Sequence, residues 1–344
     1  MYDDGRCWNI LQKKLSAVTV TVLFFITSFL FQKQVYANST EFYDEDLKGK
    51  TVIIHTNDIH GKVLYGQSQS LGIKTVAALK EKCLKAGANV ILLDAGDTLY
   101  GTTIANYNKG SSIVELMNAV GYDAMVSGNH DYELGYEHLI SLSKQMDFPM
   151  LAANVTDVKS NQLIFNDDLL IERNGVTYGI FGLVTKSTMT VNQAEDVSGI
   201  QVLNPVVVAQ LQVERLRAKG ADVIIALSHV GIKAQDEVDC LDIIRSVKGI
   251  DIIIDGHSHT SLADCIRANK KSNTLYVSTG CHLRAIGVII IDQDKSMRAY
   301  ELSELKLYKA GLEAELVGVG KTSKYLERVI KILDRAEKEI VEGR

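Results

Sequence analysis

The 344-residue sequence lacks closely paired cysteines and lacks an excess of positive charge. It contains five cysteines, and the absence of any Cys-x-x-Cys pair excludes zinc-ribbon and dithiol redox motifs of that type. The spacing of the other four cysteines beyond Cys7 leaves open whether they are free thiols or disulfides. The net charge is −5, so a nucleic acid polymer is not an expected partner.

Long apolar runs are also absent, with one exception near the N-terminus. Residues 15–31 contain no charged side chain, follow Lys13 and Lys14, and lead to Val35-Tyr36-Ala37. This layout is typical of a secretory signal peptide, so we expect residues 1–37 to be a signal segment cleaved after Ala37. The alternative is an uncleaved anchor that contacts the membrane through this segment only, since its length is at the lower limit of a span. Either interpretation predicts an exported protein that is extracellular, cell-surface or periplasmic.

Beyond a polar spacer at 38–50, short β-rich runs alternate with segments of helical periodicity. Strands are predicted at 51–56, 90–94, 124–127, 150–153, 176–183, 223–228, 252–255, 275–279 and 286–292. Helices are predicted at 73–86, 112–120, 133–146, 206–219 and 237–247. Several strands are continuously apolar, which indicates sheets covered on both faces, so the expected class is α/β with an antiparallel portion at 285–307.

The segment after the expected catalytic domain, residues 51–307, is short. Residues 308–344 are predicted to be a connecting segment followed by one helix from residue 321 onward. The apolar side of that helix would carry Leu326, Val329, Ile330, Leu333 and Ile340. No internal repeat or low-complexity linker suggests a further domain.

Polar motifs follow five of the predicted strands. They are Asp58-Ile-His60, Gly96-Asp97, Gly128-Asn129-His130-Asp131, Ser228-His229 and Gly256-His257-Ser258-His259. In open α/β sheets, ligands bind beyond the carboxyl ends of the strands, so these motifs are expected to converge. Each motif alone is compatible with an ordinary turn, whereas their joint occurrence favours a metal site. Imidazole and carboxylate together suit zinc, manganese, iron or cobalt better than calcium or magnesium.

The stretches HTNDIHG, AGDTLYG, SGNHDYELG, ALSHVG and DGHSH occur in the order and context of the calcineurin-like metallophosphoesterases. The sequence resembles the exported branch that contains 5'-nucleotidases, UDP-sugar hydrolases and 2',3'-cyclic-nucleotide phosphodiesterases. This resemblance implies a four-layer α/β/β/α sandwich with two divalent metal ions above the sheets. It also implies a small phosphorylated substrate, with nucleotides favoured, and it leaves the oligomeric state open.

The resemblance assigns the metal ligands residue by residue. The first ion would be held by Asp58, His60, Asp97 and His259, and the second by Asp97, Asn129, His229 and His257. Two cations about 3.5–4 Å apart can bind phosphate oxygens and lower the pKa of a shared water, and the resulting hydroxide attacks phosphorus in line.

The same resemblance gives His130 a catalytic role beside the transferring phosphoryl group, as a charge stabiliser or a general acid. Related enzymes carry a carboxylate three residues after this histidine, usually aspartate. This sequence has Glu133 there, one methylene longer, and we expect it to orient His130. Asp131 is expected to be structural.

Other polar residues near these motifs are expected to have structural roles. His55 should pack within its strand, His138 should lie in a helix as a core or surface residue, and Asp94 should cap or hydrogen-bond backbone. His282 is not expected to belong to the site. A position of Asn154 in the lining of the cleft is left open.

Full-length 5'-nucleotidases have a second domain that supplies aromatic and arginine side chains for the substrate, and this sequence ends before it. We therefore expect a truncated enzyme, an enzyme for a simpler ester, or a chain completed by another protein. Aromatic residues make up only 7% of the sequence and offer no obvious substitute for the missing base platform. The alternative functions are a non-catalytic metal-binding or surface-interaction protein and, more distantly, a thiosulfate-ester hydrolase of related fold.

Overall fold

The computed structural model describes residues 34–36, 42, 45–232, 237–269, 272–303 and 324–342. Two predictions fall mainly elsewhere. Most of the predicted signal segment, and most of the predicted connection at 308–323, lie outside the described residues. Of the signal segment, only strand β1 (Gln34–Tyr36) is described, and it forms an edge of the largest sheet by pairing in parallel with β14 (Met297–Ser303).

The largest sheet has seven strands in the order β1-β14-β13-β2-β3-β4-β5. Its remaining strands are β13 (Ala285–Ile291), β2 (Thr51–Thr56), β3 (Asn89–Asp94), β4 (Ala124–Val126) and β5 (Met150–Leu151). From β2 to β5 the strands are parallel, whereas β13 is antiparallel to both β2 and β14. The parallel arrangement brings the carboxyl ends of β2, β3 and β4 to one edge of the sheet.

The second sheet has five strands in the order β12-β11-β10-β8-β7. The bounds are β12 (Leu275–Val277), β11 (Ile252–Asp255), β10 (Val223–His229), β8 (Val176–Val184) and β7 (Asp168–Arg173). The pairing is parallel except between β7 and β8. A short antiparallel pair, β6 (Val155–Asp157) and β9 (Ile200–Val202), stands apart from both sheets.

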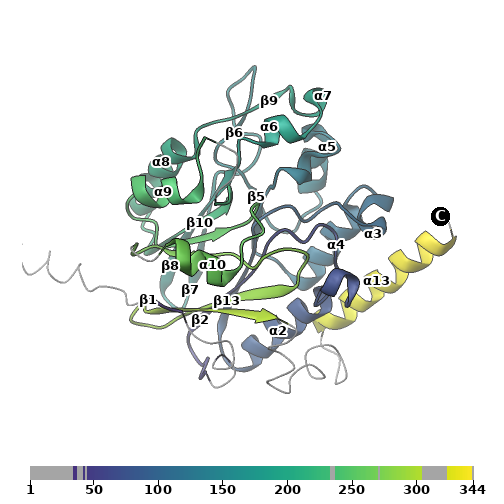
Figure 1. The fold of residues 1–344 in the computed structure, drawn as a ribbon. Coiled ribbons are helices and arrows are strands. Elements are labelled where there is room, and N and C mark those ends of the chain that lie inside the picture. Colours follow the sequence, from purple (N-terminus) through teal and green to yellow (C-terminus); the bar gives the residue numbers. More distant parts are fainter. Residues whose placement is uncertain are drawn as a thin grey trace, which may run out of the picture. The chain divides into compact units, whose positions relative to one another are not determined.

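Helices cover the outer faces of the two sheets (Figure 1). The long ones are α2 (Ile73–Lys85), α4 (Ser111–Val120), α5 (Tyr136–Ser143), α8 (Pro205–Ala218) and α13 (Lys324–Glu342). The shorter ones are η2 (Gln67–Gln69), α3 (Thr103–Tyr107), η3 (His130–Tyr132), α6 (Thr188–Val191), α7 (Ala194–Val197), α9 (Cys240–Ser246) and α10 (Leu262–Ala268). None of the helices in the described part of the chain combines the length and apolar character that a bilayer crossing requires.

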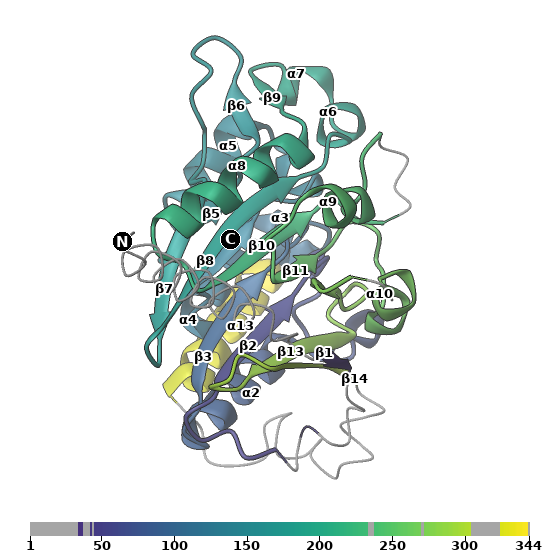
Figure 2. The same ribbon diagram turned by 90° about the vertical axis from the view of Figure 1, so that its left-hand side faces the viewer.

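Strand β10 shows how the layers are built. Its residues Val223, Ile225 and Leu227 pack in the core between the two sheets, while Ile224 and Ala226 pack in a second core under α8 and α9. Successive side chains of a strand point to opposite faces, so a continuously apolar strand fills two cores at once. The strands of the second sheet are seen in front of β2 and β3 in Figure 2. The predicted α/β sandwich, with helices outside two face-to-face sheets, is confirmed.

Several predicted helices differ from the observed ones, among them the helix expected at 237–247, which begins only at Cys240. The helix expected at 133–146 is shorter and begins at Tyr136, because Gly135 at φ 86° forms a turn after η3. The C-terminal helix α13 packs through Val329, Ile332, Leu333 and Ala336. The prediction for α13 was therefore right in position but missed two of its buried residues.

Candidate metal centre

The predicted ligands lie at strand ends of both sheets. Asp58, Asp97 and Asn129 follow β2, β3 and β4 of the seven-stranded sheet, whereas His229 ends β10 and His257 follows β11 of the second sheet. The site therefore spans the carboxyl edges of two sheets, which is where α/β folds bind ligands.

Five of the seven candidate ligands have left-handed backbone conformations. The φ angles are 49° for Asp58, 48° for His60, 55° for Asp97, 70° for His257 and 51° for His259. Such conformations cost non-glycine residues about 1–3 kcal/mol each and persist only where the surrounding structure enforces them. Because five such residues lie at one site, we infer that the strained backbone orients their side chains toward a common point.

The first group of close ligand atoms consists of Asp58, His60 and His259. Nε2 of His60 lies 3.3 Å from Nε2 of His259, which in turn lies 3.4 Å from Oδ1 of Asp58. Asp58 is fully buried, whereas His259 is 43% exposed in its side chain. The carboxylate of this group is therefore buried, whereas its His259 side is exposed to solvent.

The second group consists of Asp58, Asp97 and His229, all buried. Oδ2 of Asp97 lies 3.1 Å from Nε2 of His229 and 3.9 Å from Nε2 of His60. Asp97 therefore stands between the two groups, as a bridging carboxylate would. Asp58 also reaches toward both, since its Oδ1 lies 4.0 Å from Nε2 of His229.

Among the described residues, two buried polar atoms at this site, Oδ1 of Asn129 and Nε2 of His229, have no hydrogen-bond partner, although the latter lies 3.1 Å from Oδ2 of Asp97. Nδ1 of His229 lies 2.6 Å from the carbonyl oxygen of Ala95, so Nδ1 carries a proton, and Nε2 is the nitrogen that would give up its proton to bind a cation. Leaving a buried acceptor unsatisfied costs about 1–3 kcal/mol. A cation fits these two atoms, and the imidazole, carboxylate and amide donors suit a divalent transition metal.

His257 is brought to the site without joining either close group. Its ring centroid lies 5.4 Å from that of His229, and its backbone N–H donates to both carboxylate oxygens of Asp58 at 3.1 Å. Its Nε2 lies 3.4 Å from the hydroxyl of Ser187.

Interactions between charged groups outweigh burial in setting the direction of the pKa shifts of Asp97 and His229. Burial would raise the pKa of Asp97, but the charge of His229 outweighs it and holds the pKa of Asp97 below its usual range. Burial would likewise lower the pKa of His229, yet Asp97 and Asp58 raise the pKa of His229 to about 10. The buried carboxylates thus produce a negative field that a bound cation would neutralise.

His130 adjoins the site on its exposed side. Its backbone N–H donates to Oδ1 of Asp97 at 2.7 Å, and its ring centroid lies 5.3 Å from that of His60. Nδ1 of His130 lies 2.7 Å from Oε1 of Glu133. The hydrogen bond that Nδ1 donates to Glu133 raises the pKa of His130 despite partial burial.

Glycines make the approach of these segments possible. A Cβ on Gly96 would lie 2.6 Å from the backbone nitrogen of Gly128 and 2.8 Å from Nδ1 of His229. A Cβ on Gly128 would lie 2.1 Å from Oδ1 of Asp97. Backbone without side chains is therefore required on both sides of Asp97.

The family model described as "Calcineurin-like phosphoesterase" matches residues 51–261, more than half of the chain. The chain belongs to the calcineurin-like phosphoesterase family. The trifunctional nucleotide phosphoesterase protein YfkN of Bacillus subtilis is 32% identical over 238 residues, which are 60% of this chain and 16% of that protein. The 5'-nucleotidase of Bos taurus is 32% identical over 225 residues, which are 61% of this chain and 38% of that protein.

Solved structures agree with this assignment. A crystal structure of calcineurin-like phosphoesterase YfkN from Bacillus subtilis superposes with a TM-score of 0.69 at 25% identity, covering 86% of this chain and 98% of that one. The sulfate thiohydrolase SoxB of Thermus thermophilus shares the fold, with a TM-score of 0.67 at 18% identity over 83% of this chain and 60% of that one. The chain spans less than half the length of the two curated relatives.

In this calcineurin-like phosphoesterase, Asp131 and Asp94 stabilise the loops that carry the candidate ligands. Asp131 accepts hydrogen bonds from the backbone N–H groups of Asp97, Thr98, Leu99 and Gly128. Asp94 accepts hydrogen bonds from the hydroxyls of Thr56 and Thr98 and from the backbone N–H of Gly96. Both carboxylates hold the loops that carry the ligands, so their predicted structural roles are confirmed.

Three more predictions concern residues away from the ligands. His55 is buried in β2 and His138 is bound on the surface, with Nε2 2.9 Å from the carbonyl of Lys109, as expected. The cleft role left open for Asn154 is wrong. Its side chain is buried and binds the backbone N–H and carbonyl of Val184 and the carbonyl of Leu203, so it is a structural clamp.

Two residues beside the site were missed. His282 was set aside, yet its ring centroid lies 5.7 Å from that of His60 and 6.1 Å from that of His259, and its Nδ1 is buried without a partner. Asn57 donates to Oδ2 of Asp58 at 2.7 Å and accepts from Thr279, which fixes the Asp58 carboxylate. The position of Asn57 next to Asp58 was a usable signal, whereas His282 comes from a distant loop.

Proposed function

We propose that this chain is a phosphoester hydrolase that depends on two divalent metal ions, zinc, manganese, cobalt or iron. The observation that carries the proposal is the position of Asp97, whose Oδ2 lies 3.1 Å from Nε2 of His229 and 3.9 Å from Nε2 of His60. A carboxylate between two groups of imidazoles and carboxylates suits a bridge between two cations.

The proposed ligands form two sets, one for each ion, and Asp97 belongs to both. Asp58, His60 and His259 would hold one ion, His229, Asn129 and His257 the other, and Asp97 would hold both. When bound, the ions would neutralise the phosphate and lower the pKa of a water nucleophile. The amide ligand Asn129 adds no negative charge, so the site can accept an anionic substrate.

His130 would act on the phosphoryl group from the exposed side. With Nδ1 turned to Glu133 at 2.7 Å, its Nε2 is the nitrogen left to contact the substrate. From there it can donate a hydrogen bond to a phosphoryl oxygen or a proton to the leaving oxygen. Glu133 keeps the ring in that orientation.

The favoured substrates are nucleotides, as phosphomonoesters or 2',3'-cyclic phosphodiesters. The names of the relatives support this choice, since they include a trifunctional nucleotide phosphoesterase and a 5'-nucleotidase. We also propose that the protein is exported, as its apolar N-terminal run predicts. A snake venom 5'-nucleotidase of Naja atra, 31% identical over 61% of this chain and 41% of that protein, is in keeping with export.

The test is a substrate panel with added manganese, zinc or cobalt. It compares AMP, UDP-glucose, 2',3'-cyclic AMP and p-nitrophenyl phosphate, with metal content measured in parallel. Metal-dependent hydrolysis of a nucleotide is the expected result. Stoichiometric metal binding without hydrolysis of any of the four would instead support the non-catalytic metal-binding alternative, which has no need of His130.

A further inference from the structure

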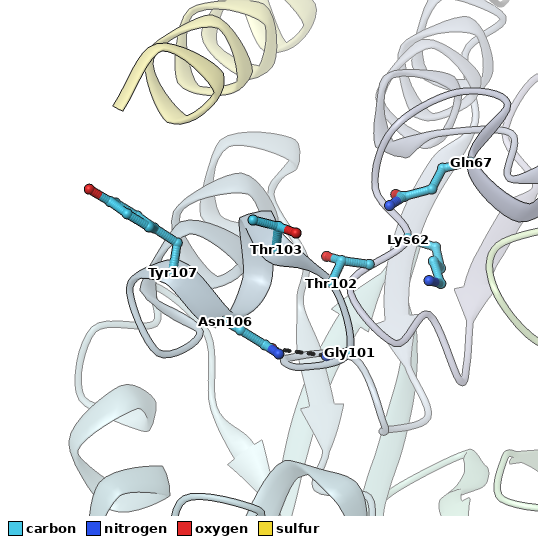
Figure 3. Close-up of a pocket in the computed structure, with 7 residues that line it drawn as sticks. All are labelled: Lys62, Gln67, Gly101, Thr102, Thr103, Asn106 and Tyr107. Atoms are coloured by element: carbon cyan, nitrogen blue, oxygen red, sulfur yellow. Dashed lines mark hydrogen bonds between the residues drawn. The ribbon is translucent and has the colours of Figure 1, made fainter. Parts of the chain in front are cut away.

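A groove of about 650 Å³ opens beside the candidate metal centre. It is lined by Lys62, Gln67, Gly101, Thr102, Thr103, Asn106 and Tyr107 (Figure 3). Its volume is in the range that proteins use for small ligands. None of these residues is a candidate metal ligand, so the groove is a separate surface next to the site.

The groove begins at the backbone of a metal-ligand candidate. A Cβ on Gly101 would lie 2.7 Å from the carbonyl oxygen of His60, and the hydroxyl of Thr102 donates to the carbonyl of Gly61 at 2.8 Å. Lys62 follows His60 by two residues. A substrate whose phosphate binds at the candidate metal centre can therefore extend its leaving group into the groove.

Two cations at this rim lack a carboxylate partner. Within the described part of the chain, neither Lys62 nor Arg284 forms an ion pair, and Arg284 uses its Nε to bind the carbonyl of Ser68 at 3.0 Å. Lys62 and Arg284 thus differ from Arg217, for example, which pairs with Asp251 at 2.7 Å. Unpaired cations beside a phosphate site raise the local concentration of anions.

Hydrogen bonds hold the two cation-bearing segments together. The hydroxyl of Ser70 donates to the carbonyl of Lys62 at 2.7 Å, and the backbone N–H of Leu71 donates to the carbonyl of Leu283 at 2.9 Å.

The polar and aromatic residues that line the groove lie on different sides of it. Lys62 and Gln67 stand on one side, and Tyr107, 41% exposed, is at the opposite end (Figure 3). Oε1 of Gln67 is buried and has no hydrogen-bond partner in the part of the chain that the structure describes. Charge near the metal ligands, an unsatisfied amide and an exposed ring suit a polar leaving group with an anionic group at its inner end.

We propose that Lys62, flanked by Arg284, binds a second phosphate group of the substrate, adjacent to the phosphate that is cleaved. The groove then holds the rest of the leaving group and favours diphosphate over monophosphate compounds. This inference rests on the proposed function, because it assumes that the cleaved phosphate lies at the candidate metal centre.

The experiment compares ADP, AMP and p-nitrophenyl phosphate as substrates of Lys62→Met and Arg284→Met. Lys62→Met is expected to lower kcat/KM for ADP by about 10- to 100-fold, the effect of losing a charge-assisted hydrogen bond, and Arg284→Met to lower it less. Values for AMP and p-nitrophenyl phosphate should stay within about twofold of wild type. Lys248→Met is the matched control, because Lys248 is exposed and precedes β11, at the opposite end of that strand from His257.

Calorimetric binding of inorganic pyrophosphate and phosphate, in excess manganese, separates this inference from the proposed function. If wild type hydrolyses nothing but Lys62→Met weakens pyrophosphate binding at least tenfold without affecting phosphate, the proposed function fails and the second phosphate subsite stands. An equal loss for ADP and AMP, or no loss of pyrophosphate binding, overturns the subsite.

Discussion

Nδ1 of His130 lies 2.7 Å from Oε1 of Glu133, three residues further along the chain. The extra methylene of glutamate therefore does not prevent the contact that an aspartate makes in related sequences. Both side chains are about half exposed, so the contact stabilises the fold little and acts mainly by orienting the ring.

Replacing His130 with alanine tests its catalytic role. His130→Ala should lower kcat by about 10²- to 10⁴-fold if the imidazole serves as a general acid or charge stabiliser. Bound metal, measured by elemental analysis, should stay near the wild-type amount, because His130 is not among the proposed ligands. Loss of metal in this variant would mean that the ring is a ligand.

The partner of His130 can be tested with a conservative pair of variants. Glu133→Gln removes the charge that orients the ring and should lower kcat by about tenfold with KM nearly unchanged. Glu133→Asp keeps the carboxylate and should recover most of the activity. Equal activity in the glutamine variant and wild type would show that the 2.7 Å contact has no catalytic effect.

The proposed bridging role of Asp97 predicts that its replacement loses both activity and bound metal. Asp97→Asn should abolish hydrolysis of p-nitrophenyl phosphate and reduce bound metal, because the amide cannot neutralise two cations. Asp147→Asn, between α5 and β5, is a control for a lost exposed carboxylate. A fully active Asp97→Asn protein would exclude the two-metal mechanism.

Glycine substitutions separate backbone strain from steric exclusion at the site. Gly96 and Gly220 have nearly equal φ angles, 86° and 88°, so alanine strains both backbones by a similar 1–2 kcal/mol or so. Only Gly96 has neighbours closer than 3 Å to the added Cβ, whereas Gly220 has none within 4 Å. Gly96→Ala should therefore lose metal affinity, measured by calorimetry, while Gly220→Ala should lose a little stability and no affinity.

The burial of His55 predicts that the folded protein loses stability at acidic pH. Burial lowers the pKa of His55 to about 3, whereas in the unfolded chain it is about 6.5. Between these values only the unfolded chain binds the proton, so stability is complete above pH 6.5 and falls as pH decreases. At pH 5 the loss is about 2 kcal/mol relative to pH 7.5.

Denaturant unfolding of His55→Leu should lack this component of the pH dependence. Ile54→Val in the same strand is the control, because a packing defect without a titrating group shifts the free energy of unfolding equally at both pH values. If wild type and His55→Leu lose the same stability between pH 7.5 and pH 5, the ring is protonated in the folded protein.

The sequence by itself determined the apolar buried strands and the ligand types, whereas the strands β6, β7 and β9 were not predicted. Apolar runs such as β2 and β11 were predicted at their observed bounds, because a strand buried on both faces can only be apolar and must end where polar residues begin. The turn after each strand then carries the carboxylates and imidazoles, so the motifs could be found without knowing which strands are neighbours.

Only the tertiary structure decided which side chains meet. The reach of Asp58 toward both ligand groups, the clamp made by Asn154 and the approach of His282 to His60 depend on how the two sheets pack, and sequence spacing carries no information on that. The same holds for Lys62 and Arg284, 222 positions apart in the numbering, which hydrogen bonds between two loops bring to one rim. Local pattern fixes periodicity and turns, whereas contacts between distant segments follow from the packing of the layers.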